Sequence, residues 1–171
     1  MDTNVWSTRR LRYGSMRRRH PKLWEYVCTF IDQHSIDSVI EVGCGDKPIA
    51  RDLVHQYIGI DLNNRCDAIH KDFNRMQTKN LPASDLLLAC NVIEHISHPE
   101  TFIRKCLDCP TRWILISFFD QAKLKREKNY IRKTRRGFYR NKYSRQWIDT
   151  QLPNIQWIRV EKNTTIAVVE R

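Results

Sequence analysis

SVIEVGCGDKPIARDLVHQYIGIDL, residues 38–62, contains the pattern that decides the fold of this chain. Its β-branched run at residues 39–42 predicts a buried strand. Gly43 and Gly45 follow at once, and two glycines after a strand allow a tight turn and a close approach of the backbone to a ligand. Residues 48–55 then predict a short helix, with a proline tolerated in its first turn.

A second strand is predicted at residues 57–60, and it ends at Asp61, twenty positions after Glu41. In a strand–glycine turn–helix–strand unit, an acid at this point reaches the ribose hydroxyls of a nucleotide across the strand ends. A glycine pair alone is weak evidence, but an acid before it and another after it make the pattern much more specific. The stretch therefore predicts a binding site for a nucleotide-type cofactor.

Several motifs together resemble the class I (Rossmann-like) S-adenosylmethionine (SAM)-dependent methyltransferases. Residues 41–45 (EVGCG) resemble the family's first motif, Asp/Glu-x-Gly-x-Gly-x-Gly, although Lys47 replaces its third glycine. Asp61 matches the ribose-binding acid, and residues 71–73 (KDF) resemble the third-strand motif that embraces the adenine. Residues 91–96 (NVIEHI) resemble the segment after the fourth strand in many small members, which carries a Glu-His motif.

This resemblance implies a fold, a cofactor and its binding residues. The fold would be α/β, a three-layer sandwich with a mostly parallel seven-stranded sheet whose last strand is antiparallel. The cofactor would be SAM, bound by Glu41, Gly43, Cys44, Gly45, Asp61, Leu62, Asp72, Phe73, Cys90 and Asn91. In two groups of the family the last motif belongs to a metal site, Glu-x-x-Glu-His. Here Asn91 replaces the first Glu, and a neutral amide is a poorer ligand for a hard cation, so no metal is expected.

Glu94 and His95 are the candidate catalytic residues. An unshifted histidine pKa of roughly 6.5 suits a general base that deprotonates an acceptor near neutral pH. Adjacent residues on a helix diverge by about 100°, so the two side chains are not expected to bond to each other. The alternative is that this pair only shapes the loop beside the cofactor.

Length and composition indicate one domain in a reducing compartment. The 171 residues are enough for a single core, and no apolar stretch approaches the roughly 20 residues of a membrane span. The six cysteines lie mostly in apolar stretches, as free cytosolic thiols do, and no signal peptide is recognisable. We expect a cytoplasmic protein with a basic arm at residues 1–20 and a methyltransferase domain at residues 21–171.

The net charge of +11 is concentrated in two segments. Residues 9–22 hold seven Arg or Lys and no acid, and residues 123–145 hold eleven with one acid, whereas the remaining chain is acidic. Such blocks attract polyanions, and the second one belongs to a predicted acceptor-side insertion at about residues 121–145. The predicted substrate-binding residues are Arg17, Arg18, Arg19, Phe118, Phe119, Arg132, Lys133, Arg135 and Arg136.

Basic side chains interleaved with aromatics favour a nucleic-acid acceptor, RNA more than DNA. Two alternatives remain open at this point. The Glu-His loop favours a methyltransferase for a small-molecule or glycan-like metabolite, and the short chain allows a non-catalytic SAM- or nucleic-acid-binding subunit.

Overall fold

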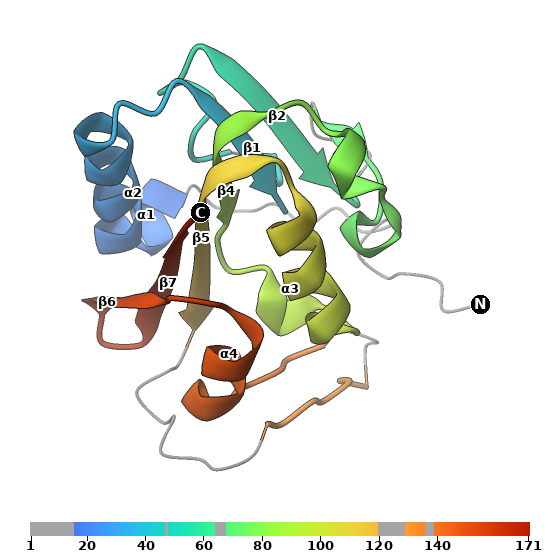
Figure 1. Cartoon of the computed structure of the whole chain (residues 1–171). Coiled ribbons are helices and arrows are strands. Elements are labelled where there is room, and N and C mark those ends of the chain that lie inside the picture. Colours follow the sequence, from blue (N-terminus) through green and yellow to red (C-terminus); the bar gives the residue numbers. More distant parts are fainter. Residues whose placement is uncertain (1–15, 47, 64–67, 120–128, 136–138) are drawn as a thin grey trace.

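Seven strands form a single sheet in the computed structural model, which describes residues 16–46, 48–63, 68–119, 129–135 and 139–171 (Figure 1). Their order across the sheet is β3-β2-β1-β4-β5-β7-β6. The first five strands run parallel, and β7 runs antiparallel to both β5 and β6. The strands are β1 (Ser38–Val42), β2 (Gln56–Asp61), β3 (Ile69–His70), β4 (Ser84–Ala89), β5 (Thr111–Phe119), β6 (Gln156–Glu161) and β7 (Thr164–Glu170). This arrangement confirms the predicted fold class.

Helices cover both faces of the sheet and complete the three layers. The α-helices are α1 (Met16–Arg19), α2 (Pro21–Gln33), α3 (Pro99–Asp108) and α4 (Arg145–Gln151), and 3-10 turns lie at η2 (Phe73–Arg75), η3 (Thr78–Asn80) and η4 (Ile93–His95). Helix α2 packs on one face, while α3 and α4 pack on the other. Ser144 caps the N-terminus of α4, because its hydroxyl accepts the Trp147 N–H at 3.1 Å.

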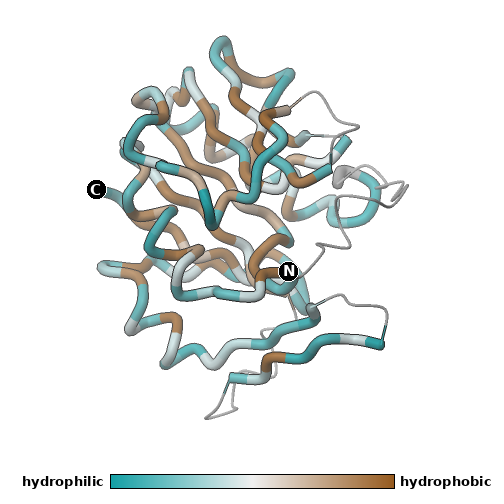
Figure 2. The backbone as a smooth tube through the Cα atoms, turned by 90° about the vertical axis from the view of Figure 1, so that its right-hand side faces the viewer, coloured by the Kyte–Doolittle hydropathy of each residue, from teal (hydrophilic) through white to brown (hydrophobic). Residues whose placement is uncertain are grey.

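The alternation of side chains along β5 divides the core between these two faces. Ile114, Ile116 and Phe118 point toward α3 and α4, whereas Trp113 and Leu115 point toward α2. Apolar stretches accordingly gather along the central strands, and polar stretches lie at the periphery (Figure 2). Phe118 is fully buried, with its ring centroid 5.8 Å from that of Trp157. The strand's alternation therefore puts this ring in the core, away from any acceptor.

The predicted helix at residues 48–55 is wrong, since these residues form bends and turns. Only thirteen residues connect the end of β1 to the start of β2. A helix that returns along a five-residue strand of about 17 Å needs roughly eleven residues, and the glycine turn already uses several. The chain instead returns as irregular turns that end where the Asp37 carbonyl accepts the N–H groups of His55 and Gln56.

A basic hairpin, residues 129–143, lies outside the sheet and is described at residues 129–135 and 139–143. Its two arms pair at two antiparallel bridges, Tyr130 with Lys142 and Lys133 with Tyr139. It makes up most of the strongly positive segment of residues 123–145, and residues 129–145 contain no acidic side chain.

The two edge strands of the sheet are short or irregular. Strand β3 has only two residues, and β6 carries a shift in its pairing with β7 between Arg159 and Glu161.

The neighbouring residues Phe118 and Phe119 provide a test of this core, because Phe118 is fully buried and Phe119 is 45% exposed. We expect Phe118→Ala to lower the free energy of unfolding by about 3–5 kcal/mol, the usual cost of emptying a buried aromatic site. Phe119→Ala should change it by less than about 1 kcal/mol. Urea unfolding of the two variants measures both values, and equal losses would contradict this assignment of faces.

Candidate active site

A cavity of about 400 Å³ opens at the carboxyl ends of the central parallel strands. Open α/β sheets bind their ligands at this edge, because the loops after the strands converge there. Nine of the ten residues predicted to bind the cofactor line this cavity, all except Glu41. The nine are Gly43, Cys44, Gly45, Asp61, Leu62, Asp72, Phe73, Cys90 and Asn91.

The glycine turn after β1 forms one wall of the cavity. Gly43 and Gly45 have φ angles of +70° and +59°, in the left-handed region that other residues rarely adopt. A Cβ atom on Gly43 would lie 2.3 Å from Cγ2 of Val92. The turn therefore requires glycine both for its backbone conformation and for its close approach to the loop after β4.

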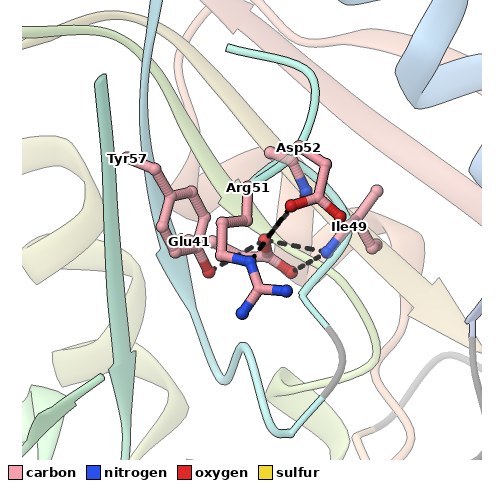
Figure 3. A network of polar contacts seen from close by, with 6 residues as sticks. Glu41, Ile49, Arg51, Asp52 and Tyr57 are labelled. Carbon is pink, nitrogen blue, oxygen red and sulfur yellow. Dashed lines mark hydrogen bonds and ion pairs between the residues drawn. The ribbon is translucent and has the colours of Figure 1, made fainter. Parts of the chain in front are cut away.

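Glu41 lies behind this turn and holds it in place (Figure 3). Its buried carboxylate accepts the N–H groups of Ile49 and Ala50 at 3.0 and 3.1 Å, and the Tyr57 hydroxyl donates to it at 3.2 Å. Burial raises the pKa of Glu41 to about 7, although these donors oppose the shift. Glu41 thus shapes the wall of the site from outside the cavity.

Asp61 and Asp72 both line the cavity, and their carboxylates accept hydrogen bonds from the local backbone. Asp61, at the end of β2, accepts the N–H groups of Gly45 at 2.9 Å and Asn63 at 2.7 Å. Asp72 caps η2 by accepting the Asn74 N–H at 3.0 Å. Phe73 beside it is buried, and its centroid lies 5.4 Å from that of Phe102 in an edge-to-face contact.

The loop after β4 forms the neighbouring wall and starts with a left-handed residue. Asn91 has φ +56°, and its N–H donates to the Ser117 hydroxyl at 2.8 Å. Asparagine tolerates this conformation better than most residues. The backbone turn places Glu94 and His95, in η4, at the cavity lining.

Glu94 is a buried carboxylate that is only half satisfied. Its Oε1 accepts the Phe119 N–H, while Oε2 has no hydrogen-bond partner among the described residues. Burial raises the pKa of Glu94 to about 7. The unpartnered oxygen can therefore accept a hydrogen bond from a ligand when Glu94 is ionised and donate one when it is protonated.

His95 contributes an imidazole whose tautomer is fixed by its surroundings. Its Nδ1 lies 2.9 Å from the Tyr139 carbonyl oxygen in the basic hairpin. A carbonyl oxygen only accepts, so Nδ1 carries the proton and Nε2 carries the lone pair. Burial lowers the pKa of His95, although this hydrogen bond opposes the shift. The lowered pKa keeps the ring neutral near pH 7.

The predicted substrate residues are only partly brought to the cavity. Arg19 and Phe119 line it, whereas Phe118 lies in the core. Arg18 and the hairpin residues Arg132, Lys133 and Arg135 are exposed and lie outside the lining. The side chain of Arg17 and all of Arg136 lie outside the described residues.

Sequence reasoning missed several residues of the site. His20 and Val92 line the cavity, and Tyr139 and Asn141 bond its loop from the hairpin. Val92 lies within the motif of residues 91–96, so the predicted site residues beside it were a signal that could have identified it. The hairpin contacts join residues more than forty positions apart, and no local pattern signals them.

The volume and polar lining of the site fit a nucleotide-type cofactor. The cavity volume lies within the roughly 300–1,000 Å³ typical of small-molecule sites, and two acidic residues line it, Asp61 at the end of β2 and Asp72 just after β3. Among the described residues, no three His, Cys, Asp or Glu side chains converge to hold a metal ion. None of the described helices has the length and apolarity needed to cross a membrane.

The buried carboxylate of Glu94 predicts a specific dependence of stability on pH. Its pKa of about 7 in the folded chain exceeds its ordinary 4.5, so the folded state holds this proton more tightly. Its contribution to stability is therefore fullest below pH 4.5 and is lost as pH rises through 7. Relative to Glu94→Gln, the wild type should lose on the order of 3 kcal/mol between pH 4.5 and 8, at about 1.4 kcal/mol per pKa unit.

Urea unfolding of the two proteins across this pH range measures the difference. Glu25→Gln, which changes an exposed glutamate on α2, is the control and should follow the wild type. Parallel curves for wild type and Glu94→Gln would contradict the raised pKa.

A family described as a methyltransferase domain matches residues 8–166 of this chain. The malonyl-[acyl-carrier protein] O-methyltransferase of Bacteroides fragilis is 25% identical over 113 residues, which cover 55% of this chain and 23% of that protein. This chain therefore spans about a quarter of that relative's length.

Two solved structures show the same fold. The small RNA methyltransferase HEN1 has a TM-score of 0.68 and 16% identity, and the match covers 96% of this chain and 27% of that one. The N-terminal domain of EvdMO1, solved in the presence of S-adenosylhomocysteine (SAH) and D-fucose, has a TM-score of 0.62 and 14% identity over 90% of this chain and 84% of that one. Because the family match covers most of its length, the chain belongs to the methyltransferase domain family.

Proposed function

We propose that this chain is a SAM-dependent methyltransferase that acts on a nucleic-acid acceptor, RNA rather than DNA, which binds along the basic hairpin and places its reacting atom in the cavity. One observation carries the proposal. The hairpin is bonded directly to the loop that bears Glu94 and His95, through the Tyr139 carbonyl and the Asn141 N–H. A strongly positive surface is thus attached to the proposed reaction centre.

The composition of this surface suits a single-stranded polyanion. Arg132, Lys133 and Arg135 are exposed, and the exposed Tyr130 lies on the same arm. Cations that contact phosphates, together with aromatic rings that stack on bases, are the usual means of binding single strands. Arg19 lines the cavity from α1, and we propose that the basic segments at residues 1–20 and 121–145 both contribute to acceptor binding.

We propose that the nine lining residues hold SAM, with Asp61 at the ribose and Asp72 and Phe73 at the adenine. Glu41 supports their turn from behind. When bound, SAM supplies a methyl group on a positively charged sulfur, which is already a strong electrophile. The chain's main task is then to align the acceptor and exclude water.

We assign the Glu94–His95 pair to the Glu-His motif of the family's small type, and propose that it handles the acceptor's proton. His95 is neutral near pH 7 and has its lone pair on Nε2, so it takes the proton that an acceptor hydroxyl loses as its oxygen gains the methyl group. In its ionised form, Glu94 accepts a hydrogen bond at Oε2, the oxygen without a partner among the described residues, from a second donor group of the acceptor. Glu94 thus orients the acceptor, and His95 activates its O–H group.

A small-molecule or glycan-like acceptor is the second candidate function. It is supported by the cavity itself, which is lined by Phe119 and His95 and is large enough for a compact ligand. The EvdMO1 domain was solved with D-fucose. In this case the basic hairpin would bind one phosphate at most, or none.

The cofactor assignment predicts that Asp61→Ala weakens the binding of both SAM and SAH by about 10- to 100-fold. This range corresponds to the loss of one hydrogen bond to a charged group, about 1.5–3 kcal/mol. Isothermal titration calorimetry measures the affinities. Asp46→Ala, which removes an exposed carboxylate from the same turn, is the control and should bind like the wild type. Unchanged affinity in Asp61→Ala would contradict the assignment.

The acceptor proposal predicts that a radiolabelled methyl group from SAM enters the RNA fraction of a cell extract. The extract is separated into RNA, DNA, protein and small-molecule fractions after the reaction. Label in small molecules would support the second candidate instead, and label in protein or DNA would contradict both.

A hairpin variant tests the binding surface by itself. Arg132→Ala/Arg135→Ala should weaken binding of a single-stranded uridine oligonucleotide on the order of tenfold. The slope of log affinity against log salt should fall by about 1–1.5, because two phosphate contacts are lost. Arg51→Ala/Lys79→Ala removes two exposed charges that precede the amino ends of β2 and β4 and should bind normally. SAM affinity should stay constant in both variants.

A further inference from the structure

The basic hairpin and the loop after β4 are joined by a dense set of hydrogen bonds. The Asn141 backbone N–H donates to the Glu94 carbonyl at 2.8 Å, and the Tyr143 hydroxyl donates to the Ile93 carbonyl at 2.8 Å. The Tyr139 carbonyl accepts from His95. Every residue of η4 (Ile93–His95) is thus bonded to the hairpin.

Asn141 lies at the centre of this set and is 2% exposed. Its Nδ2 donates to the Ile96 carbonyl at 2.6 Å and to the Tyr143 hydroxyl at 2.9 Å. Its Oδ1 accepts the Arg132 N–H from the opposite arm at 3.3 Å. One buried amide therefore ties both arms of the hairpin and the end of the loop together.

We infer that Asn141 is a positioning residue: it fixes the hairpin on the loop so that the Tyr139 carbonyl holds His95 with its proton on Nδ1. The role of His95 as a base rests on the proposed function, but its tautomer does not. A base needs its lone pair on the nitrogen that faces the acceptor, and the hydrogen bond at the other nitrogen sets which one that is.

The same contacts link acceptor binding to the base. Arg132 presents its side chain to an acceptor on the outside of the hairpin, while its N–H bonds Asn141 on the inside. Tyr139 belongs to the pair of residues that bridges the two arms. When the two arms of the hairpin are paired and bonded to the loop after β4, the hairpin therefore provides an acceptor contact and also holds His95 in the correct tautomer.

The direct test is the His95 tautomer in Asn141→Ala, measured without SAM or acceptor. Long-range proton–nitrogen NMR of the ¹⁵N-histidine-labelled full chain distinguishes a protonated Nδ1 from an unprotonated one, and the missing signals in His95→Gln assign the resonances. We expect a single Nδ1–H tautomer in the wild type and a mixture of tautomers in Asn141→Ala. Tyr143→Phe, which keeps the ring but removes one hydrogen bond to the loop, should give a smaller change in the same direction.

Asn129→Ala is the matched control. Asn129 lies at the base of the same hairpin, and its Oδ1 accepts the Ser144 N–H at 2.8 Å, away from η4. This variant should keep the wild-type tautomer. If both Asn141→Ala and Tyr143→Phe fold, bind SAM normally and keep a single Nδ1–H tautomer, the inference is overturned.

Activity provides an independent readout once an acceptor is in hand. Asn141→Ala should lower kcat by about 10- to 100-fold with little change in the KM for SAM, because a general base contributes roughly 10²- to 10⁴-fold. The acid limb of its pH profile should move to higher pH as the ring becomes more exposed. If the tautomer changes in Asn141→Ala but the wild type methylates no RNA, the acceptor proposal is overturned and this inference stands. If the tautomer is unchanged in Asn141→Ala but the wild type methylates RNA, this inference is overturned and the acceptor proposal stands.

Discussion

The cofactor side of the protein depends on the buried carboxylate of Glu41. Two backbone N–H groups and the Tyr57 hydroxyl converge on it, and they come from the irregular crossover between β1 and β2 and from β2 itself. A buried carboxylate is costly unless its oxygens are bonded. The crossover therefore cannot relax without leaving the carboxylate unsatisfied, and this constraint fixes the glycine turn in front of it. The glycine turn itself contacts Asp61 and Val92. The hydrogen bonds of Glu41 therefore help to place two walls of the cavity.

The sequence was sufficient for the strands and for most of the cofactor side. β-Branched runs mark buried strands, and the carboxyl ends of parallel strands share one edge, so residues 43–45, Asp61 and residues 90–91 had to converge there. The predicted helix at residues 48–55 was wrong because the connection between β1 and β2 is too short for one. Eight residues are also too few to show a helical period clearly. The difference between Phe118 and Phe119 was equally hidden, since it depends on the side to which β5 turns each residue. The hairpin contacts of Asn141 join distant residues and leave no local pattern.

The two sides of the cavity are held by different means. The side proposed to bind the cofactor is built on hydrogen bonds within the first half of the chain, whereas the side proposed to bind the acceptor is a hairpin outside the sheet. Burial acts in opposite directions on the two titrating groups of the intervening loop, raising the pKa of Glu94 and lowering that of His95. Both shifts favour the uncharged form, so the loop carries less charge near neutral pH than two ordinary side chains of these types would.

The irregular edges of the sheet have a consequence for the behaviour of many copies of this chain together. An exposed strand edge is a template on which another chain can add a strand, and it promotes aggregation during folding. Here one edge is only two residues long, and the other combines a break in pairing with charged side chains at Arg159 and Glu161. Both edges therefore offer little continuous backbone for intermolecular pairing, although the five strands between them contribute most of the sheet's buried apolar side chains.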